Sequence, residues 1–423
     1  MQLVILAGGK GTRLGLADRP KPMVEINKKP LLEHQILLAK EYGIKEIFIL
    51  SSYKAEIITS YFKDGKKFGI KIHHIIEETP LGTAGALKTI EEKLEDRFLV
   101  FYGDIYMDFD IKSFIEFDKQ HDSVGTLLLH PNDHPEDSDL VEIDKKNIVK
   151  NLILKPHNDI YYTNLVNAAV FIFSKKIFNY INKNTFCQIE KDIIPTLLEN
   201  NETIIGYKNA EYVKDVGTPL RLKEVTKDIV NKKTKKLNKK NKRPCIFLDR
   251  DGVINEDMKT NPTCESFKLL PQVIDAIRLI NQSEYLAIIV TNQPMIAKGF
   301  VSIEEVETTH KKLETILGKN NAYLNAIYYC PHHPERGFKG EIKKLKFDCN
   351  CRKPKIGMLE EARNDFNIDI ENSWIIGDSE KDIQAGNNFG CKTISVQKNI
   401  KADYNAQNIL DAVKYILSKN KTK

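Results

Sequence analysis

Short apolar runs rich in β-branched residues alternate with longer amphipathic segments along the first half of the chain. The runs occupy residues 3–8, 46–52, 72–76 and 98–104. Because they are continuous rather than alternating, they predict buried strands of a parallel sheet. Segments 30–43 and 82–94 fit the helices that would connect such strands. In these folds ligands gather at the carboxyl ends of the strands, so we expect functional residues directly after each strand.

Strand-like runs return in the second half, and each one leads into polar residues. The segments are CIFLDRDGVIN at 245–255, LAIIVTNQ at 286–293 and SWIIGDSEKD at 373–382. The pattern of the whole chain therefore predicts the α/β class, with two doubly wound Rossmann-like domains.

A lysine-rich tract separates the two halves. Between Lys232 and Arg243 the chain carries eight positive charges, no acidic residue and one aliphatic residue, Leu237. Blocks of like charge repel and stay solvated, which favours a hydrated linker. A polyanion-binding patch is the alternative, but the tract has no aromatic residue to stack on bases. We therefore predict domains at 1–230 and 244–423, with the linker at 231–243.

Composition adds little beyond this division. The 423 residues are 41% hydrophobic and carry a net charge of +6, which becomes −2 without the tract. No apolar run approaches the roughly 20 residues that span a bilayer, and the first strand leaves no room for a signal peptide. The seven cysteines are an odd number, which argues against a disulfide framework. We expect a cytoplasmic enzyme of small-molecule substrates, without nucleic-acid or membrane partners.

A glycine-rich loop follows the first strand. Gly8, Gly9 and Gly11 allow a tight turn whose N–H groups can surround phosphate oxygens. Arg13 and Lys21 add positive charge that suits a triphosphate. The spacing matches neither the dinucleotide-binding fingerprint nor the P-loop, so the loop alone does not identify a nucleotide site.

The wider string AGGKGTRLGLADRPKPM resembles the signature of sugar-1-phosphate nucleotidyltransferases. The resemblance continues through ETPLGTAG at 78–85, Tyr102-Gly103-Asp104, Lys155-Pro156, Asn167-Ala168, Glu190-Lys191-Asp192 and DVGTP at 215–219. It implies a GT-A-like domain, with Mg²⁺ on Asp104 and Asp215 and with Arg13 and Lys21 as catalytic cations. It also implies a group of nucleotide- and sugar-phosphate-binding residues: Gly8, Gly9, Gly11, Thr12, Gly82, Thr83, Lys155, Asn167 and Glu190. Ala169 departs from the family, which usually has glycine there.

Two anions must meet in the reaction that this resemblance implies. A sugar 1-phosphate oxygen attacks the α-phosphate of a nucleoside triphosphate, and pyrophosphate leaves. Cations and Mg²⁺ therefore supply most of the stabilisation. The PKPM and DVGTP strings look most like guanylyltransferases acting on mannose or manno-heptose 1-phosphate, so we expect GTP as the second substrate.

The second half places an acid, a hydroxyl and a lysine after successive strands. Asp249 and Asp251 follow the first strand, and Thr291 and Asn292 end the next. Arg352, Lys353, Asp378 and Asp382 come later in the chain. This set suits covalent phosphate hydrolysis, with Asp249 as nucleophile and Asp251 as acid and base. Thr291 and Lys353 would bind phosphoryl oxygens, and Asp249, Asp378 and the Asp251 carbonyl would hold Mg²⁺.

Three cysteines and a histidine in this half have the spacing of a metal site. Cys330 and His332 precede Cys349 and Cys351 by sixteen intervening residues, which is a full tetrahedral set for structural Zn²⁺. His333 is the less favoured fourth ligand. Because Arg352 and Lys353 follow Cys351 directly, zinc would preorganise these cations rather than take part in chemistry.

The DRDGVIN, TNQ, CPHHP and CNCRKP strings resemble heptose 1,7-bisphosphate phosphatases of the haloacid-dehalogenase (HAD) superfamily. The resemblance implies that Asn292, Lys298 and Arg352 contact the substrate, although Lys298 stands where the family has arginine. Together the two resemblances imply one enzyme that removes the 7-phosphate of D-glycero-D-manno-heptose 1,7-bisphosphate and joins D-glycero-α-D-manno-heptose 1-phosphate to GMP from GTP.

Two alternatives remain open. Mannose-1-phosphate guanylyltransferase could be fused to a histidinol-phosphate-type or other small-molecule phosphatase. A nucleic-acid repair protein could instead use the lysine tract beside a 3′-phosphatase-like domain, and would then bind oligonucleotides with a steep salt dependence.

Overall fold

The computed structural model describes residues 1–9, 11, 14–15, 18–157, 161–258, 262–397 and 399–420. The chain divides into two compact units. Unit 1 comprises Met1–His130, Ser138–Lys155 and Leu165–Asn238, and unit 2 comprises Pro131–Asp137, Pro156–Asn164 and Lys239–Lys423. Among the described helices, none has both the length and the apolar character that crossing a bilayer requires.

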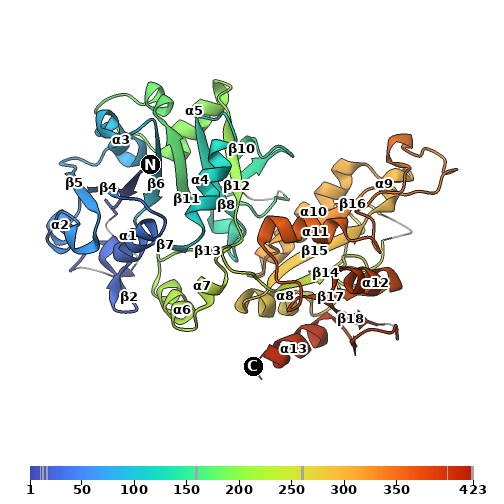
Figure 1. Cartoon of the computed structure of the whole chain (residues 1–423). Coiled ribbons are helices and arrows are strands. Elements are labelled where there is room, and N and C mark those ends of the chain that lie inside the picture. Colours follow the sequence, from blue (N-terminus) through green and yellow to red (C-terminus); the bar gives the residue numbers. More distant parts are fainter. Residues whose placement is uncertain are drawn as a thin grey trace. The chain divides into compact units, whose positions relative to one another are not determined.

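Unit 1 contains a mixed sheet whose parallel half carries the predicted strands. The parallel strands are β1 (Gln2–Leu6), β4 (Glu46–Ser51), β5 (Lys71–Ile76) and β6 (Arg97–Tyr102). The described sheet runs in the order β10-β9-β11-β6-β1-β4-β5, while β8 pairs with β11 and β12 pairs with β8 (Figure 1). Strand β11 (Val166–Ser174) lies antiparallel to β6, so half of the sheet does not follow the β–α alternation.

The remaining elements of unit 1 complete this sheet and cover it. The other sheet strands are β8 (Gly125–His130), β9 (Leu140–Ile143), β10 (Val149–Ile153) and β12 (Ile204–Lys208). Two small ladders pair β2 (Glu25–Ile26) with β3 (Lys29–Pro30) and β7 (Ile105–Asp108) with β13 (Tyr212–Asp215). The helices are α1 (Leu31–Glu41), α2 (Ala55–Phe62), α3 (Gly82–Lys88), α4 (Ile111–Lys119), α5 (Ile194–Glu199), α6 (Pro219–Val230) and α7 (Lys233–Lys236).

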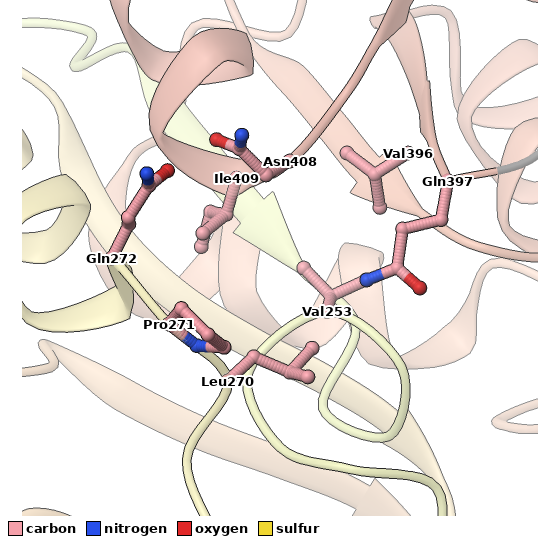
Figure 2. A pocket seen from close by; sticks show the side chains of 8 residues that line it. All are labelled: Val253, Leu270, Pro271, Gln272, Val396, Gln397, Asn408 and Ile409. Carbon is pink, nitrogen blue, oxygen red and sulfur yellow. The ribbon is translucent and has the colours of Figure 1, made fainter.

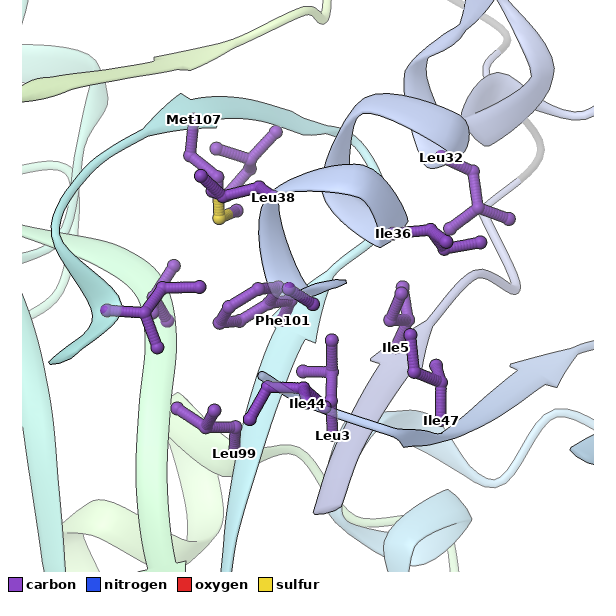
Figure 3. Packing of buried hydrophobic residues seen from close by; sticks show 14 of the residues in the cluster. Leu3, Ile5, Leu32, Ile36, Leu38, Ile44, Ile47, Leu99, Phe101 and Met107 are labelled. Carbon is purple, nitrogen blue, oxygen red and sulfur yellow. The ribbon is translucent and has the colours of Figure 1, made fainter. Parts of the chain in front are cut away.

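Apolar layers bury both faces of the unit 1 sheet. Leu3 and Ile5 of β1 belong to one layer, and Val4 between them belongs to the other. Side chains of successive strand residues point to opposite faces, so a strand buried on both sides must be apolar throughout. Figure 3 shows side chains of α1 and of the strands meeting in the first layer. The continuous apolar runs of the sequence have this physical cause.

Unit 2 contains a fully parallel sheet in the order β16-β15-β14-β17-β18-β19. These strands are β14 (Cys245–Leu248), β15 (Leu286–Asn292), β16 (Ala326–Cys330), β17 (Trp374–Gly377), β18 (Lys392–Val396) and β19 (Tyr404–Ala406). The described helices are α8 (Val273–Gln282), α9 (Pro294–Ala297), α10 (Ile303–Gly318), α11 (Gly357–Phe366), α12 (Glu380–Phe389) and α13 (Ile409–Asn420). The strand order changes direction around β14, which places β14 at the switch point where such folds bind ligands.

The lysine-rich tract is not solvated throughout, contrary to the sequence expectation. Asn238 is fully buried in unit 1, where its side-chain amide donates to Asp108 Oδ1 over 2.9 Å. Arg243 is buried in unit 2, where its Nε donates to the carbonyl of Phe366 over 2.9 Å. The unit boundary falls between these anchors, after Asn238. Polar residues with long-range hydrogen-bond partners thus interrupt the charged tract.

We predict that Phe101→Ala lowers the free energy of unfolding by about 3–5 kcal/mol, because it leaves a cavity in a close-packed layer. Phe101 is completely buried in β6, three residues before Asp104. The matched control is Phe186→Ala, because Phe186 is 60% exposed and its truncation should change stability by less than about 0.5 kcal/mol. Urea denaturation followed by circular dichroism measures both values, and equal losses would contradict the packing argument.

Candidate active sites

In unit 1, a buried lysine bridges two aspartates at the ends of different strands. Lys21 is 6% exposed, and its Nζ lies 2.7 Å from Asp104 Oδ2 and 3.0 Å from Asp215 Oδ1. Asp104 follows β6, whereas Asp215 ends β13. The antiparallel register pairs Asp215 with Ile105, next to Asp104, so the small ladder brings the two carboxylates together. This arrangement agrees with the predicted pairing of Asp104 and Asp215.

Electrostatics keep the Asp215 carboxylate charged. Burial raises the pKa of this carboxyl, but Lys21 and Arg221 outweigh burial and hold the pKa below its usual value. Arg221 Nη1 lies 2.8 Å from Asp215 Oδ2. Two carboxylates at one point, with oxygen as their donor atom, fit a hard divalent cation such as Mg²⁺.

Part of the glycine-rich loop belongs to the same site. Gly11 has a φ of +70°, and a Cβ at that position would lie 2.9 Å from Lys21 Cβ. Glycine is therefore needed both for the left-handed backbone and for the close approach to Lys21. A Cβ at Gly8 would lie 3.1 Å from Ser52 Oγ and 3.8 Å from Glu77 Oε2, whereas no atom of the described residues would lie within 4 Å of a Cβ at Gly9. Thr12 and Arg13, which the sequence analysis assigned to this loop, lie outside the described residues.

The predicted sugar-binding residues form a hydrogen-bonded group. Tyr102 donates its hydroxyl to Glu190 Oε2 over 2.8 Å, and the Asn167 amide lies 3.5 Å from Glu190 Oε1. Burial raises the pKa of the Glu190 carboxyl. Thr83 accepts from the N–H of Ile189 at the start of the short π-helical segment Ile189–Ile193, which carries Glu190.

Two further predicted residues flank this group. Lys155 is exposed, and its backbone N–H donates to Asp139 Oδ1, while the Asn167 N–H donates to the Asp139 carbonyl. Asp139 therefore connects Lys155 to β11. Gly82 begins α3 with a φ of +76°, and a Cβ there would clash with the Cys187 carbonyl.

In unit 2, a second buried lysine bridges two aspartates. Lys353 is 2% exposed, and its Nζ lies 2.9 Å from Asp249 Oδ1 and 2.5 Å from Asp382 Oδ1. Its Nζ also donates to the Val290 carbonyl over 2.7 Å. Burial and the Asp382 charge raise the pKa of Asp249 to about 7, although Lys353 opposes them. Burial lowers the pKa of Lys353, but the two carboxylates raise it above its usual value.

The carboxylate oxygens of Asp249, Asp378 and Asp382 lie within 4.8 Å of one another and fit a divalent cation. Asp382 had no assigned role in the sequence analysis, which proposed Asp249, Asp378 and Asp251 as ligands. Asp382 sits in the first turn of α12, where its Oδ2 accepts from the backbone N–H and hydroxyl of Ser379. Its spacing of four residues from Asp378 is the signal that could have identified it.

The Asp251 carboxylate has a separate set of partners. It accepts from Arg250 Nη2 at 3.0 and 3.1 Å, from Asn255 Nδ2 at 2.9 Å and from Gln293 Nε2 at 2.8 Å. Gln293 also donates to Thr291 Oγ1 over 2.9 Å. Burial raises the pKa of Asp251, but these donors outweigh burial and hold it below its usual value. The sequence analysis assigned no role to Arg250 or Gln293.

Asn292 and Lys298 occupy different surroundings. Asn292 Oδ1 accepts from the N–H of Lys353, and its Nδ2 donates to the Lys353 carbonyl, so this amide fixes the lysine backbone. Lys298 Nζ lies 4.6 Å from the centre of the Phe338 ring. The structure thus gives Asn292 a supporting contact that the sequence analysis had not predicted.

The predicted zinc ligands converge. The ligand atoms of Cys330, His332, Cys349 and Cys351 lie within 4.8 Å of one another. The three sulfur atoms are separated by 3.2–3.5 Å, and His332 Nδ1 lies 3.2 Å from Cys351 Sγ. Three thiols and one imidazole at these separations are compatible with tetrahedral zinc. Arg352 Nη1 donates to the His332 carbonyl over 3.4 Å, which ties this cation to the cluster.

A cavity of about 170 Å³ lies beside the loop that follows Asp251 (Figure 2). Its lining consists of Val253, Leu270, Pro271, Gln272, Val396, Gln397, Asn408 and Ile409. These side chains are apolar or carry uncharged amides. Since no cation lines the cavity, it does not suit a phosphate group.

Comparison with known proteins gives separate matches for the two halves. The nucleotidyl transferase family model matches residues 2–232, and the HAD-hydrolase-like model matches residues 350–418. D-glycero-beta-D-manno-heptose-1,7-bisphosphate 7-phosphatase of Salmonella typhi is 39% identical over 153 residues, which are 36% of this chain and 79% of that protein. Mannose-1-phosphate guanylyltransferase of Mycobacterium tuberculosis is 31% identical over 220 residues, which are 51% of this chain and 61% of that protein.

One solved structure among the matches is HddC from Yersinia pseudotuberculosis complexed with GMP-PN. It is 31% identical, and the match covers 54% of this chain and 99% of that chain with a TM-score of 0.47.

We predict that Ala169→Gly stabilises the protein by about 1 kcal/mol. Ala169 has a φ of +52°, a left-handed backbone in which Cβ approaches the following carbonyl oxygen. Ala168→Gly is the control, since Ala168 is buried in the same strand without a positive φ. This variant should lower the free energy of unfolding by about 0.5–1 kcal/mol. Thermal or urea denaturation distinguishes them, and destabilisation by both changes would contradict the assignment of strain.

Proposed function

Because this chain belongs to the nucleotidyl transferase family and to the D-glycero-beta-D-manno-heptose-1,7-bisphosphate 7-phosphatase family, we propose that it is a bifunctional enzyme of heptose activation. Its second domain removes the 7-phosphate of D-glycero-D-manno-heptose 1,7-bisphosphate. Its first domain transfers GMP from GTP to the resulting D-glycero-α-D-manno-heptose 1-phosphate and releases pyrophosphate. The product of one reaction is the substrate of the other, which gives a physical reason for the fusion.

The observation that carries the phosphatase half is the cluster around Lys353. Asp249 attacks phosphorus, the bond from phosphorus to the sugar oxygen breaks, and Asp251 gives its proton to the leaving alkoxide. Asp251 then takes a proton from water, which attacks the aspartyl-phosphate, releases phosphate and regenerates Asp249. Thr291 and Lys353 bind the phosphoryl oxygens. Asp249, Asp378, Asp382 and the Asp251 carbonyl would hold Mg²⁺, which supplies charge neutralisation.

In the transferase half, Lys21 and the two aspartates support nucleotidyl transfer. Asp104 and Asp215 would hold Mg²⁺, which neutralises the triphosphate. Lys21 is already placed between these aspartates, where it also offsets negative charge during transfer. We assign the pyrophosphate clamp to Arg13 and the sugar-phosphate contacts to Lys155, Asn167 and Glu190. The glycine-rich loop and Gly82-Thr83 would contact the nucleotide.

A second candidate is mannose-1-phosphate guanylyltransferase beside the same phosphatase, and the match to the Mycobacterium tuberculosis guanylyltransferase favours it. It differs from the first candidate only in the sugar that accepts GMP. Both candidates are enzymes of small-molecule substrates, and neither requires nucleic acid or a membrane.

We predict that the full chain converts heptose 1,7-bisphosphate, GTP and Mg²⁺ into GDP-heptose, phosphate and pyrophosphate. The curated phosphatase relatives are named for the β anomer, so the assay offers the α and β bisphosphates separately. Mass spectrometry identifies the sugar nucleotide with each of the four nucleoside triphosphates. Formation of GDP-mannose from mannose 1-phosphate, without GDP-heptose from either anomer, would establish the second candidate instead.

Matched variants separate the two reactions in this assay. Asp249→Asn should abolish phosphate release but leave GDP-heptose formation from supplied heptose 1-phosphate, because the nucleophile is lost only in unit 2. Asp104→Ala should abolish GDP-heptose formation but leave phosphate release from the bisphosphate. If either variant silenced both activities in a folded protein, the two sites would not be independent.

We further predict that the Cys330, His332, Cys349 and Cys351 cluster binds one structural Zn²⁺, whose removal lowers phosphatase kcat at least about tenfold. The physical reason is that Arg352 and Lys353 follow Cys351 directly and lose their preorganisation. Metal analysis measures zinc, and chelation followed by excess Mg²⁺ restores only the magnesium sites. Transferase activity is the internal control, and full phosphatase activity without zinc would contradict the prediction.

A further inference from the structure

A buried histidine outside the proposed chemistry contacts the arginine between the two catalytic aspartates. His310 lies on α10 and is 7% exposed. Its Nε2 lies 3.2 Å from Arg250 Nη1, and Arg250 is 3% exposed. A guanidinium has donors only, so Nε2 of His310 must accept this hydrogen bond. Consistently, burial and the Arg250 charge lower the pKa of His310 to about 3, which keeps the ring neutral.

The opposite end of the same guanidinium holds Asp251. Arg250 Nη2 donates to both oxygens of Asp251 and to Gln293 Oε1 over 3.0 Å. Gln293 in turn donates to Asp251 Oδ2 and to Thr291 Oγ1. These hydrogen bonds connect His310 through Arg250 to Asp251. Gln293 contacts both Arg250 and Asp251 and so restricts their relative positions.

His310 is itself held in place by its surroundings. Its ring lies 5.4 Å from the ring of Tyr329 on β16. Tyr329 donates its hydroxyl to Glu307 Oε1 on α10, one helical turn before His310. The ring is therefore packed between a strand and its own helix, which restricts the direction in which Nε2 can accept.

We propose that His310 is a positioning residue for the phosphatase reaction, acting through Arg250 on the carboxyl group of Asp251. This inference rests on the proposed function, in which Asp251 exchanges a proton in both half-reactions. Without an acceptor atom at position 310, the buried Nη1 of Arg250 loses this hydrogen-bond partner. The guanidinium can then rotate toward a different acceptor. Asp251 then loses its fixed position relative to the leaving oxygen, although the carboxyl group itself is still present. General acid–base catalysis depends on that position.

The test compares His310→Leu, which removes the acceptor, with His310→Gln, whose amide oxygen can replace Nε2. Thr309→Val is the matched control, because Thr309 is the preceding buried residue of α10 and its hydroxyl donates to the Glu305 carbonyl of the same helix. Steady-state rates are measured with the heptose bisphosphate, which is an alkyl phosphate. Burst rates are measured with p-nitrophenyl phosphate. The burst reports formation of the aspartyl-phosphate from a leaving group that needs no proton.

We expect His310→Leu to lower kcat for the alkyl phosphate by about tenfold to a hundredfold, with KM changed by less than about twofold. The p-nitrophenyl phosphate burst should stay within about twofold of wild type. His310→Gln should recover most of the lost kcat, and Thr309→Val should match wild type. Zinc content and circular dichroism verify folding, and His310→Met replaces the leucine variant if that variant does not fold.

Three outcomes overturn the proposal. An equal loss with both substrates would mean that the variant disturbs the nucleophile or the fold rather than proton transfer. A rise in KM at constant kcat would assign His310 to substrate binding, and failure of a folded His310→Gln to recover activity would remove the acceptor argument. If the wild-type protein hydrolyses neither phosphate ester, the proposed phosphatase function itself fails, and this inference fails with it.

Discussion

The structure of each candidate site depends on one buried lysine that bridges two aspartates. Lys21 joins Asp104 to Asp215, and Lys353 joins Asp249 to Asp382. A buried ammonium without partners is strongly unfavourable, and so are buried carboxylates that face one another. Each arrangement therefore stabilises its members only while all three groups are present. This shared constraint explains why residues far apart in the sequence meet at the same points.

The two folds bring the residues of each site together in different ways. In unit 2, Asp249 directly follows β14 and the parallel neighbours β15 and β17 end at the same edge, so strand order alone assembles much of the site. In unit 1, the antiparallel pairing of β7 with β13 is required to bring Asp215 to Asp104. The first arrangement follows from the general rule for parallel sheets, whereas the second depends on a particular register.

This difference determines how much could be predicted from the sequence. The four parallel strands of unit 1 and the aspartates after β6 and β14 were predicted, because continuous apolar runs and the residues that follow them are local features. The resemblance to two families paired Asp104 with Asp215 and grouped the zinc ligands, and the structure brings each set together. The role of individual side chains remains a proposal.

Long-range contacts could not be predicted in the same way. The antiparallel β11 has the same apolar composition as a parallel strand, so its direction is not encoded in the pattern. His310 occupies a helical position whose burial looks like that of any core residue, and only its distance to Arg250 distinguishes it. Asn238 and Arg243 are buried within a tract whose charge predicts hydration, because hydrogen bonds to distant residues outweigh the local composition at these positions.

The charges within the sites also explain why the net charge of +6 carries little information about ligands. In unit 1, Lys21 and Arg221 match the charges of Asp104 and Asp215. In unit 2, the single ammonium of Lys353 pairs with the two carboxylates of Asp249 and Asp382. A phosphate ester brought to that second site would add negative charge to an excess of negative charge. Under the proposed function, a divalent cation held by these carboxylates would therefore reduce the repulsion of the substrate phosphate in unit 2 before the reaction begins.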